Sequence, residues 1–241
     1  MKKVTKILKN NSHICFLDFE GTQFTGEMIA YGAVLVSLNK KGEIKKSKEP
    51  ILFYVKAKNK IGRIVENLTG INQDTLNKVG ISFCQAMEKL KKYCGPYFSK
   101  TIFMTFGNND IRILNQSCSY NLDTPKEIVS VIQKNYVDFQ SVISEFIKDE
   151  GNNPYSLANY LSLFELDFSG TQHDPKDDAV NLSRLYDAFL KRGDIVLTSY
   201  LKTLSNTKHL PEPIKKAIVN LATGNDVSGQ EFEQYCKDYI K

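Results

Sequence analysis

Apolar residues form short runs along most of the chain, and the first long run ends in two acids. Residues 14–17 are all apolar, and Asp18, Phe19 and Glu20 follow directly. An apolar run that meets a loop signal predicts a buried strand. Alternate side chains of a strand point the same way, so we expect Asp18 and Glu20 to share one face while Phe19 occupies the other.

This acid pair predicts a cation site. Two carboxylates at the end of a buried strand repel each other and are costly to remove from water. A positive charge between them offsets both costs, and a divalent metal ion prefers the oxygen ligands that carboxylates supply. We therefore expect further ligands elsewhere in the chain.

The apolar pattern downstream predicts three consecutive strands and then strands that alternate with helices. The expected strands are residues 14–20, 28–38, 51–55, 101–106 and 135–139. Helical spacing predicts a short helix over residues 72–76, a longer one over residues 82–93, and further helices beginning near residues 110, 142, 156 and 175. Short links between the first three strands favour an antiparallel meander. The fold class is therefore α/β, a mixed sheet of three antiparallel strands and then parallel strands, flanked by helices.

The pattern changes near residue 193. Short helices follow, interrupted by Pro211, Pro213 and Gly224. Ser228 and Glu231 have the spacing of a capping box at the start of the last helix. We expect a main domain of residues 1–192 and a C-terminal helical extension of residues 193–241.

Composition limits the class of protein. The chain has 241 residues, of which 41% are hydrophobic and 24% charged, and this is typical of a soluble globular protein. No apolar run approaches the ~18 residues that a membrane span requires, and the N-terminus lacks the apolar region of a secretion signal. Five scattered cysteines without a Cys-x-x-Cys pair argue against zinc clips and a disulfide framework, and favour a cytoplasmic location.

The net charge of +5 becomes informative beside an acidic site. A polyanionic substrate needs basic surface elsewhere to offset the acids. Lysines gather in one region of the chain: Lys40, Lys41, Lys45, Lys46, Lys48, Lys56, Lys58 and Lys60. A contact for the polyanion is one interpretation, and a hairpin edge that lysines keep solvated is the other.

Two later stretches carry the other candidate ligands. Asp110 lies where a strand gives way to a helix, and taken alone it is more simply interpreted as a helix cap. His173 lies in a polar loop, and Asp178 follows five residues later, near the helix face that is turned towards the sheet. An acidic first turn of the helix explains Asp174 and Asp177. It does not explain a histidine at this place.

The order of these motifs resembles the DEDDh family of 3′→5′ exonucleases, which share a ribonuclease H-like fold. Asp-x-Glu comes first, then Asp110, then His-x-x-x-x-Asp. Residues 68–71 (Leu-Thr-Gly-Ile) are similar to a loop that precedes a helix in the family, and residues 105–110 to its aromatic-Gly-x-x-Asp motif. The Asp-Phe-Glu form and the paired acids before Ala179 look closer to the RNA-trimming and sporulation-inhibitor-like branch than to polymerase proofreading subunits. The match spans about residues 14–190.

The resemblance implies two-metal phosphodiester hydrolysis at the 3′ end of a single-stranded nucleic acid, with RNA favoured. Two ions of Mg²⁺ or Mn²⁺ would be held by Asp18, Glu20, Asp110 and Asp178. The general base that takes the proton of the attacking water would be His173. The residues that border the terminal nucleotide would be Gly21, Thr22 and Phe106.

Two departures from the family pattern concern the substrate more than catalysis. Pro175 stands where a small residue is usual, and we expect a shifted loop with the site retained. Phe106 replaces the tryptophan that is usual in the RNA-trimming branch.

Two other functions stay open, and the sequence identifies no protein partner. A DNA 3′→5′ exonuclease of proofreading or repair type would differ in how it reads the terminal 2′-OH. A non-catalytic RNA-binding adaptor would be free to lose the four acids and the histidine, all of which are present here.

Overall fold

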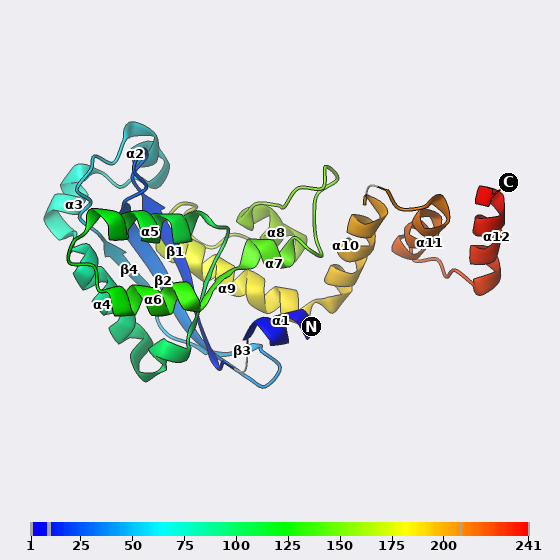
Figure 1. Cartoon of the computed structure of the whole chain (residues 1–241), viewed down its shortest axis with the longest axis horizontal. Coiled ribbons are helices and arrows are strands. Elements are labelled where there is room, and N and C mark those ends of the chain that lie inside the picture. Colours follow the sequence, from blue (N-terminus) through cyan, green and yellow to red (C-terminus); the bar gives the residue numbers. More distant parts are fainter. Residues whose placement is uncertain (1, 9–10, 208, 241) are drawn as a thin grey trace.

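A mixed sheet with helices on both faces forms the body of the protein in the computed structural model, which describes residues 2–8, 11–207 and 209–240 (Figure 1). The strands are β1 (His13–Gly21), β2 (Met28–Leu38), β3 (Ile44–Ser47), β4 (Ile51–Tyr54), β5 (Ile102–Thr105) and β6 (Tyr136–Asp138). The sheet order is β3-β2-β1-β5-β6, and β4 also pairs with β2. β2 runs antiparallel to β1, β3 and β4, whereas β5 and β6 run parallel to β1 and to each other. The predicted sheet is thereby confirmed.

The β3 strand was not expected from the pattern. It reads Ile-Lys-Lys-Ser, and its last three residues are exposed. Only its first residue, Ile44, is partly buried, so this short edge strand has no apolar alternation that a sequence argument could detect. β3 and β4 pair with successive parts of β2, so they share one edge of the sheet.

The helices surround this sheet and continue beyond it. Their bounds are α1 (Lys2–Leu8), α2 (Arg63–Thr69), α3 (Gln73–Val79), α4 (Phe83–Cys94), α5 (Asn109–Tyr120), α6 (Lys126–Lys134), α7 (Phe139–Ile143), α8 (Leu157–Leu163), α9 (Pro175–Lys191), α10 (Gly193–Ser205), α11 (Glu212–Ala222) and α12 (Gly229–Ile240), with a 3-10 turn η1 (Gly95–Lys100). The pattern did not predict α1, α2 or α6. Leu68 and Thr69, expected in a loop, belong to α2, which buries none of its residues and so has no apolar stripe.

Strand β1 divides the core into two layers. Ile14 and Phe16 pack with residues of α7, α8 and α9 on one face. Cys15, Leu17 and Phe19 pack with residues of α4, α5 and α6 on the other. Phe19 therefore lies opposite the acid pair, as the alternation predicts. The acids continue the row of Ile14 and Phe16, which faces α9.

Helix α9 begins directly against the backbone of β2. Gly32 lies opposite Asp18 in the β1–β2 ladder. A Cβ at Gly32 would lie 1.9 Å from the carbonyl oxygen of Pro175. Only glycine leaves room for such an approach of two backbones. The first turn of α9, which carries Asp178, is therefore held beside Asp18.

The C-terminal helices lead away from the sheet (Figure 1). α10 contacts the body through buried Val196, through the ring of Tyr200 against Phe146, and through Thr203, whose hydroxyl accepts a hydrogen bond from the backbone N–H of Lys148. α12 buries none of its residues. The boundary between residues 192 and 193 stays a prediction.

The last helix starts with the predicted capping box. The Glu231 N–H donates to the Ser228 hydroxyl, and the Glu231 carboxylate accepts from the Ser228 N–H. Within the described residues, every helix is too short or too polar to cross a lipid bilayer.

We expect Gly32→Ala to lower the thermal unfolding temperature by several degrees. The added methyl group has to displace the start of α9, and overpacking of this kind costs about 1–3 kcal/mol. The control is Gly229→Ala, where a Cβ meets no atom within 4 Å. Calorimetry of both variants measures the effect, and equal unfolding temperatures would contradict the close contact.

Candidate active site

Four acids from three elements meet at one end of β1. Asp18 and Glu20 end the strand, Asp110 lies in the first turn of α5, and Asp178 lies in the first turn of α9. Burial raises the pKa of Asp18 well above its ordinary value, and the negative charges of Asp110, Asp178 and Glu20 raise it further. The structure therefore brings together all four acids that the sequence singled out.

Asp110 is fixed to β1 by a buried hydrogen bond. Its carboxylate accepts from the backbone N–H of Phe19, with an N–O distance of 2.7 Å, and the side chain is 4% exposed. The N-cap of α5 is Asn108, so the interpretation of Asp110 as a cap is wrong. The bond ties the start of α5 to the residue between Asp18 and Glu20, and this sets the distance between the acids.

The turn before Asp110 depends on residues that the sequence analysis missed. Gly107 has a φ of 97°, a conformation that favours glycine. Its N–H donates to the Asp138 carboxylate over 2.9 Å. Its carbonyl accepts from the hydroxyls of Thr105 and Tyr136. No sequence signal links these residues, because the bonds depend on the pairing of β5 with β6.

The loop before α9 places His173 beside two of the acids. The His173 N–H donates to the Asp178 carboxylate over 2.9 Å, and the residue has a φ of 66°. Asp174 caps α9 and accepts from the N–H of Asp177, so it has the helix-end role that the sequence predicted. One ligand atom each of Glu20, His173 and Asp178 lie within 4.8 Å of one another. Helix α9 begins at Pro175, so the proline is accommodated as the first residue of the helix.

The site holds its carboxylates close together although their negative charges repel one another. Burial is the main cause that raises the pKa of Glu20 to about 8, of Asp110 to about 7 and of Asp178 to about 6. The charges that act on Asp18 and Glu20 are all from other carboxylates. The backbone N–H and the positive charge of His173 act in the opposite direction and lower the pKa of Asp178. A cation would reverse the repulsion.

This donor set fits a hard divalent ion. Carboxylate oxygens suit Mg²⁺ and Mn²⁺, and a cation would lower the pKa values that burial and the neighbouring carboxylates raise. The group of atoms close enough to share one ion contains Glu20, His173 and Asp178. The predicted set, with Asp18 and Asp110 as ligands and His173 as a base, stays a prediction.

The predicted nucleotide contacts lie around the same strand end. Gly21 is partly exposed, whereas Thr22 is 4% exposed and its hydroxyl accepts from the N–H of Glu27. Phe24 projects at the tip of this loop with 84% of its surface exposed. Phe106 is partly buried and packs edge-to-face on the ring of Tyr160. Gly21 ends β1, Thr22 and Phe24 lie in the loop that follows it, and Phe106 follows β5 directly.

Glu27 holds the loop after β1 in place through hydrogen bonds, and no pattern in the sequence predicted this role. Its side chain is 1% exposed. The carboxylate accepts from the N–H of Lys58 over 2.7 Å and from the N–H and side-chain amide of Asn59 over 3.0 Å. Three donors satisfy the buried charge, so the Thr22 loop is tied to the chain after β4.

Comparisons with known proteins show which proteins this chain is similar to. Residues 15–186 match the family RNase_T, described as exonuclease. No curated protein matches the sequence. A solved 3′-exonuclease that recognises the 3′ end of a histone mRNA stem-loop is 21% identical, with a TM-score of 0.60 over 76% of this chain and 83% of that chain.

Two further solved structures are similar. The nuclease domain of 3′hExo, a DEDDh family member bound to rAMP, is 22% identical, with a TM-score of 0.59 over 76% of this chain and 94% of that chain. E. coli Exonuclease I with a 5cy-dT13 oligonucleotide is 15% identical, with a TM-score of 0.58 over 81% of this chain and 44% of that chain. These likenesses show that the fold is ribonuclease H-like.

We expect the metal-free protein to lose stability as the pH rises from about 5 to 8. In this range the unfolded chain has released the proton of Glu20, whose ordinary pKa is 4.5, while the folded protein holds it up to about 8. The unfolded state then binds fewer protons, so the free energy of unfolding falls with rising pH. Added Mg²⁺ should reduce this fall.

Thermal unfolding with a chelator and with Mg²⁺, across this pH range, measures the effect. Glu20→Gln removes one of the titrating groups and should make the pH dependence less steep, while the raised pKa values of Asp110 and Asp178 maintain the rest of it. A metal-free protein whose unfolding temperature did not fall would contradict the repulsion between these acids.

Proposed function

The chain belongs to the RNase_T exonuclease family, and on this premise we propose that it removes nucleotides in the 3′→5′ direction from single-stranded nucleic acid, with RNA favoured. One observation carries the proposal: four acids from three elements converge beside His173 at the end of β1. A binding protein has no need to hold so many carboxylates against their mutual repulsion. An enzyme that uses divalent ions needs such a group of carboxylates to bind them.

We propose Asp18, Glu20, Asp110 and Asp178 as the ligands of two Mg²⁺ or Mn²⁺ ions. When bound, such ions polarise the scissile phosphate, activate a water and stabilise the leaving 3′ oxygen. The protein holds the acids in place beforehand, through the Asp110–Phe19 hydrogen bond and the contact of α9 with Gly32. The raised pKa values of the acids support a site that is incomplete without cations.

We propose His173 as the general base that takes the proton of the attacking water. Its side chain is exposed, so water reaches the ring, and a ring nitrogen lies within 4.8 Å of carboxylate oxygens of Glu20 and Asp178. Histidine exchanges protons near neutral pH. The bond from the His173 N–H to Asp178 holds the loop in a left-handed conformation, which costs about 1–3 kcal/mol and persists at functional sites.

The terminal nucleotide would lie over Gly21 and Thr22, with Phe106 at its border. The exposed ring of Phe24 on the same loop offers a stacking surface for a base. Because the Thr22 hydroxyl and its backbone N–H and carbonyl are already bonded within the loop, the Thr22 contact with the nucleotide would be one of packing.

RNA is favoured as the substrate by the resemblance of the Asp-Phe-Glu motif and the paired acids to the RNA-trimming and sporulation-inhibitor-like branch of DEDDh enzymes. The similar 3′hExo nuclease domain was solved with rAMP. The second candidate, a DNA exonuclease of repair type, is supported by the likeness to Exonuclease I with its deoxyoligonucleotide. The adaptor function ranks below both, because it requires none of the retained acids.

We also propose residues 1–192 as the catalytic domain and residues 193–241 as a helical extension, supported by the end of the family match at residue 186. Five free thiols support a reducing, cytoplasmic location.

One degradation assay tests the function. The protein is given 5′-labelled single-stranded RNA and DNA with Mg²⁺, with Mn²⁺ or with EDTA. We expect a ladder of progressively shorter labelled RNA in either metal and none in EDTA. A faster ladder on DNA would overturn the RNA preference. Intact substrate in every metal would overturn the enzymatic proposal.

Adjacent substitutions test the ligand assignment. Asp178→Asn should abolish turnover, because it removes a proposed ligand. Asp177→Asn is the matched control, since its side chain bonds the Thr171 N–H and an amide oxygen still accepts that bond. Neighbours on a helix point about 100° apart, so equal losses would show that Asp178 is not the ligand.

His173→Ala should lower kcat by roughly 10²–10⁴, the usual contribution of a general base, and leave metal binding mostly intact. Single-turnover rates and calorimetric titration with Mn²⁺ measure the two effects. If His173→Ala lost metal binding together with the rate, His173 would be a metal ligand and not the general base.

A further inference from the structure

The end of the sheet opposite the acids carries an exposed cluster of lysines. We call it the basic end, and its residues are Lys40, Lys41, Lys45, Lys46 and Lys48. They lie in the β2–β3 turn, in β3 and just after it. The same stretch contains two acids, Glu43 and Glu49, and none of the ion pairs found among the described residues includes one of the five lysines. The positive charge is therefore largely uncompensated.

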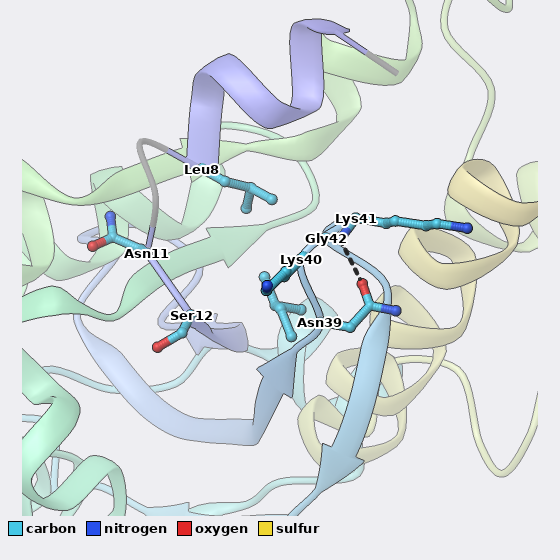
Figure 2. A pocket seen from close by; sticks show the side chains of 8 residues that line it. Leu8, Asn11, Ser12, Asn39, Lys40, Lys41 and Gly42 are labelled. Atoms are coloured by element: carbon cyan, nitrogen blue, oxygen red, sulfur yellow. Dashed lines mark hydrogen bonds between the residues drawn. The ribbon is translucent and has the colours of Figure 1, made fainter.

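The turn that carries Lys40 and Lys41 is rigid and borders a cavity of about 310 Å³. The Asn39 side-chain oxygen accepts from the backbone N–H of Lys41 and of Glu43. Figure 2 shows Lys40 reaching towards the space beside Asn11 and Ser12, while Lys41 points the other way. A fixed turn presents its charges without a large cost in backbone entropy when a ligand binds.

A second cavity at the basic end, of about 240 Å³, contains an aromatic surface. The rings of His13 and Tyr97 stack with centroids 3.9 Å apart and planes inclined by 17°. Tyr97 is 49% exposed. Lys46 and Lys48 line the same cavity. Burial, and then the positive charge of Lys48, lower the pKa of His13, so this ring pair lies in a positive potential.

Aromatic rings among lysines are the surface that single-stranded nucleic acids bind. Bases stack on the rings whatever their sequence, and the cations neutralise phosphates. Lysines that only keep an edge strand solvated need neither a cavity nor an exposed stacked ring. The combination at the basic end therefore favours a ligand that has both bases and phosphates.

The basic end and the acids lie at opposite ends of β1, and His13 and Glu20 project from opposite faces of the sheet because an odd number of residues separates them. His13 and Glu20 are seven residues apart on β1, which is roughly 23 Å at ~3.3 Å per residue. A nucleic-acid strand that contacts both places has to pass around the helices that cover the sheet, so it needs more than the roughly seven stacked nucleotides, at ~3.4 Å each, that this straight distance corresponds to.

We propose that the basic end is a second binding site for the substrate strand, which contacts phosphates and one base several nucleotides upstream of the 3′ end at the acids. This proposal rests on the proposed exonuclease function. Long substrates use both sites, whereas a trinucleotide reaches only the acids. The second site therefore lowers KM for long substrates and keeps the strand bound between successive cleavages.

The test compares substrates of two lengths on one triple variant and one double variant. The basic-end variant is Lys40→Gln, Lys45→Gln and Lys46→Gln. The matched control is Lys215→Gln with Lys216→Gln, two exposed lysines on α11. For an RNA of about 20 nucleotides we expect the basic-end variant to raise KM roughly tenfold or more with kcat unchanged, and the slope of log KM against log salt to fall by about 2. The trinucleotide KM and the control should not change.

A binding assay separates this proposal from the catalytic one. Anisotropy of a 5′-labelled RNA of about 20 nucleotides in EDTA measures affinity without turnover. The parent should bind tighter than the basic-end variant whether or not the protein cleaves RNA. Tyr97→Leu, at an exposed position, should weaken binding roughly fivefold or more through lost stacking. Equal affinities of parent and basic-end variant, or an equal rise in KM for the trinucleotide, would overturn the second site.

Discussion

Electrostatic repulsion among four carboxylates is the constraint on which this structure depends. Burial raises the pKa of Asp18 well above its ordinary value, and the nearby charges of Glu20, Asp110 and Asp178 raise it further. Three features hold them there: the buried strand β1, the bond from the Phe19 N–H to Asp110, and the contact of α9 with the backbone of Gly32. Each feature belongs to the hydrophobic core or to the backbone, so the core supplies the free energy that keeps the acids together.

The acids and the sheet could be predicted because each has a local signal. A strand's alternation assigns Asp18 and Glu20 to one face, and the capping box at Ser228 needs only residues four apart or fewer. Strand β3 and helix α2 escaped prediction because neither buries an apolar stripe. Glu27 escaped because its hydrogen-bond partners, the N–H groups of Lys58 and Asn59, come near it only after the chain has folded.

Strand β1 separates two kinds of electrostatic surface. Its C-terminal end carries the acids, which require cations before a phosphate can approach. Its N-terminal end lies beside the lysines of the basic end and the stacked rings of His13 and Tyr97. A polyanion is therefore attracted first to the basic end and repelled by the acids until cations fill them. This polarity gives a physical reason for a chain that is basic overall to contain an acidic candidate site.

If the acids hold the proposed ions, the contact between Gly32 and Pro175 has a consequence for which metal the site accepts. Both partners are backbone atoms, so the spacing of β2 and α9 does not change when surface side chains are exchanged. Selectivity between Mg²⁺ and the larger Ca²⁺ depends on cavity size and on the flexibility of the ligands. A site whose width is set by two touching backbones cannot expand easily around a larger ion. Redesign of its ion preference would have to begin at this strand–helix spacing, because exchange of the acids leaves the width unchanged.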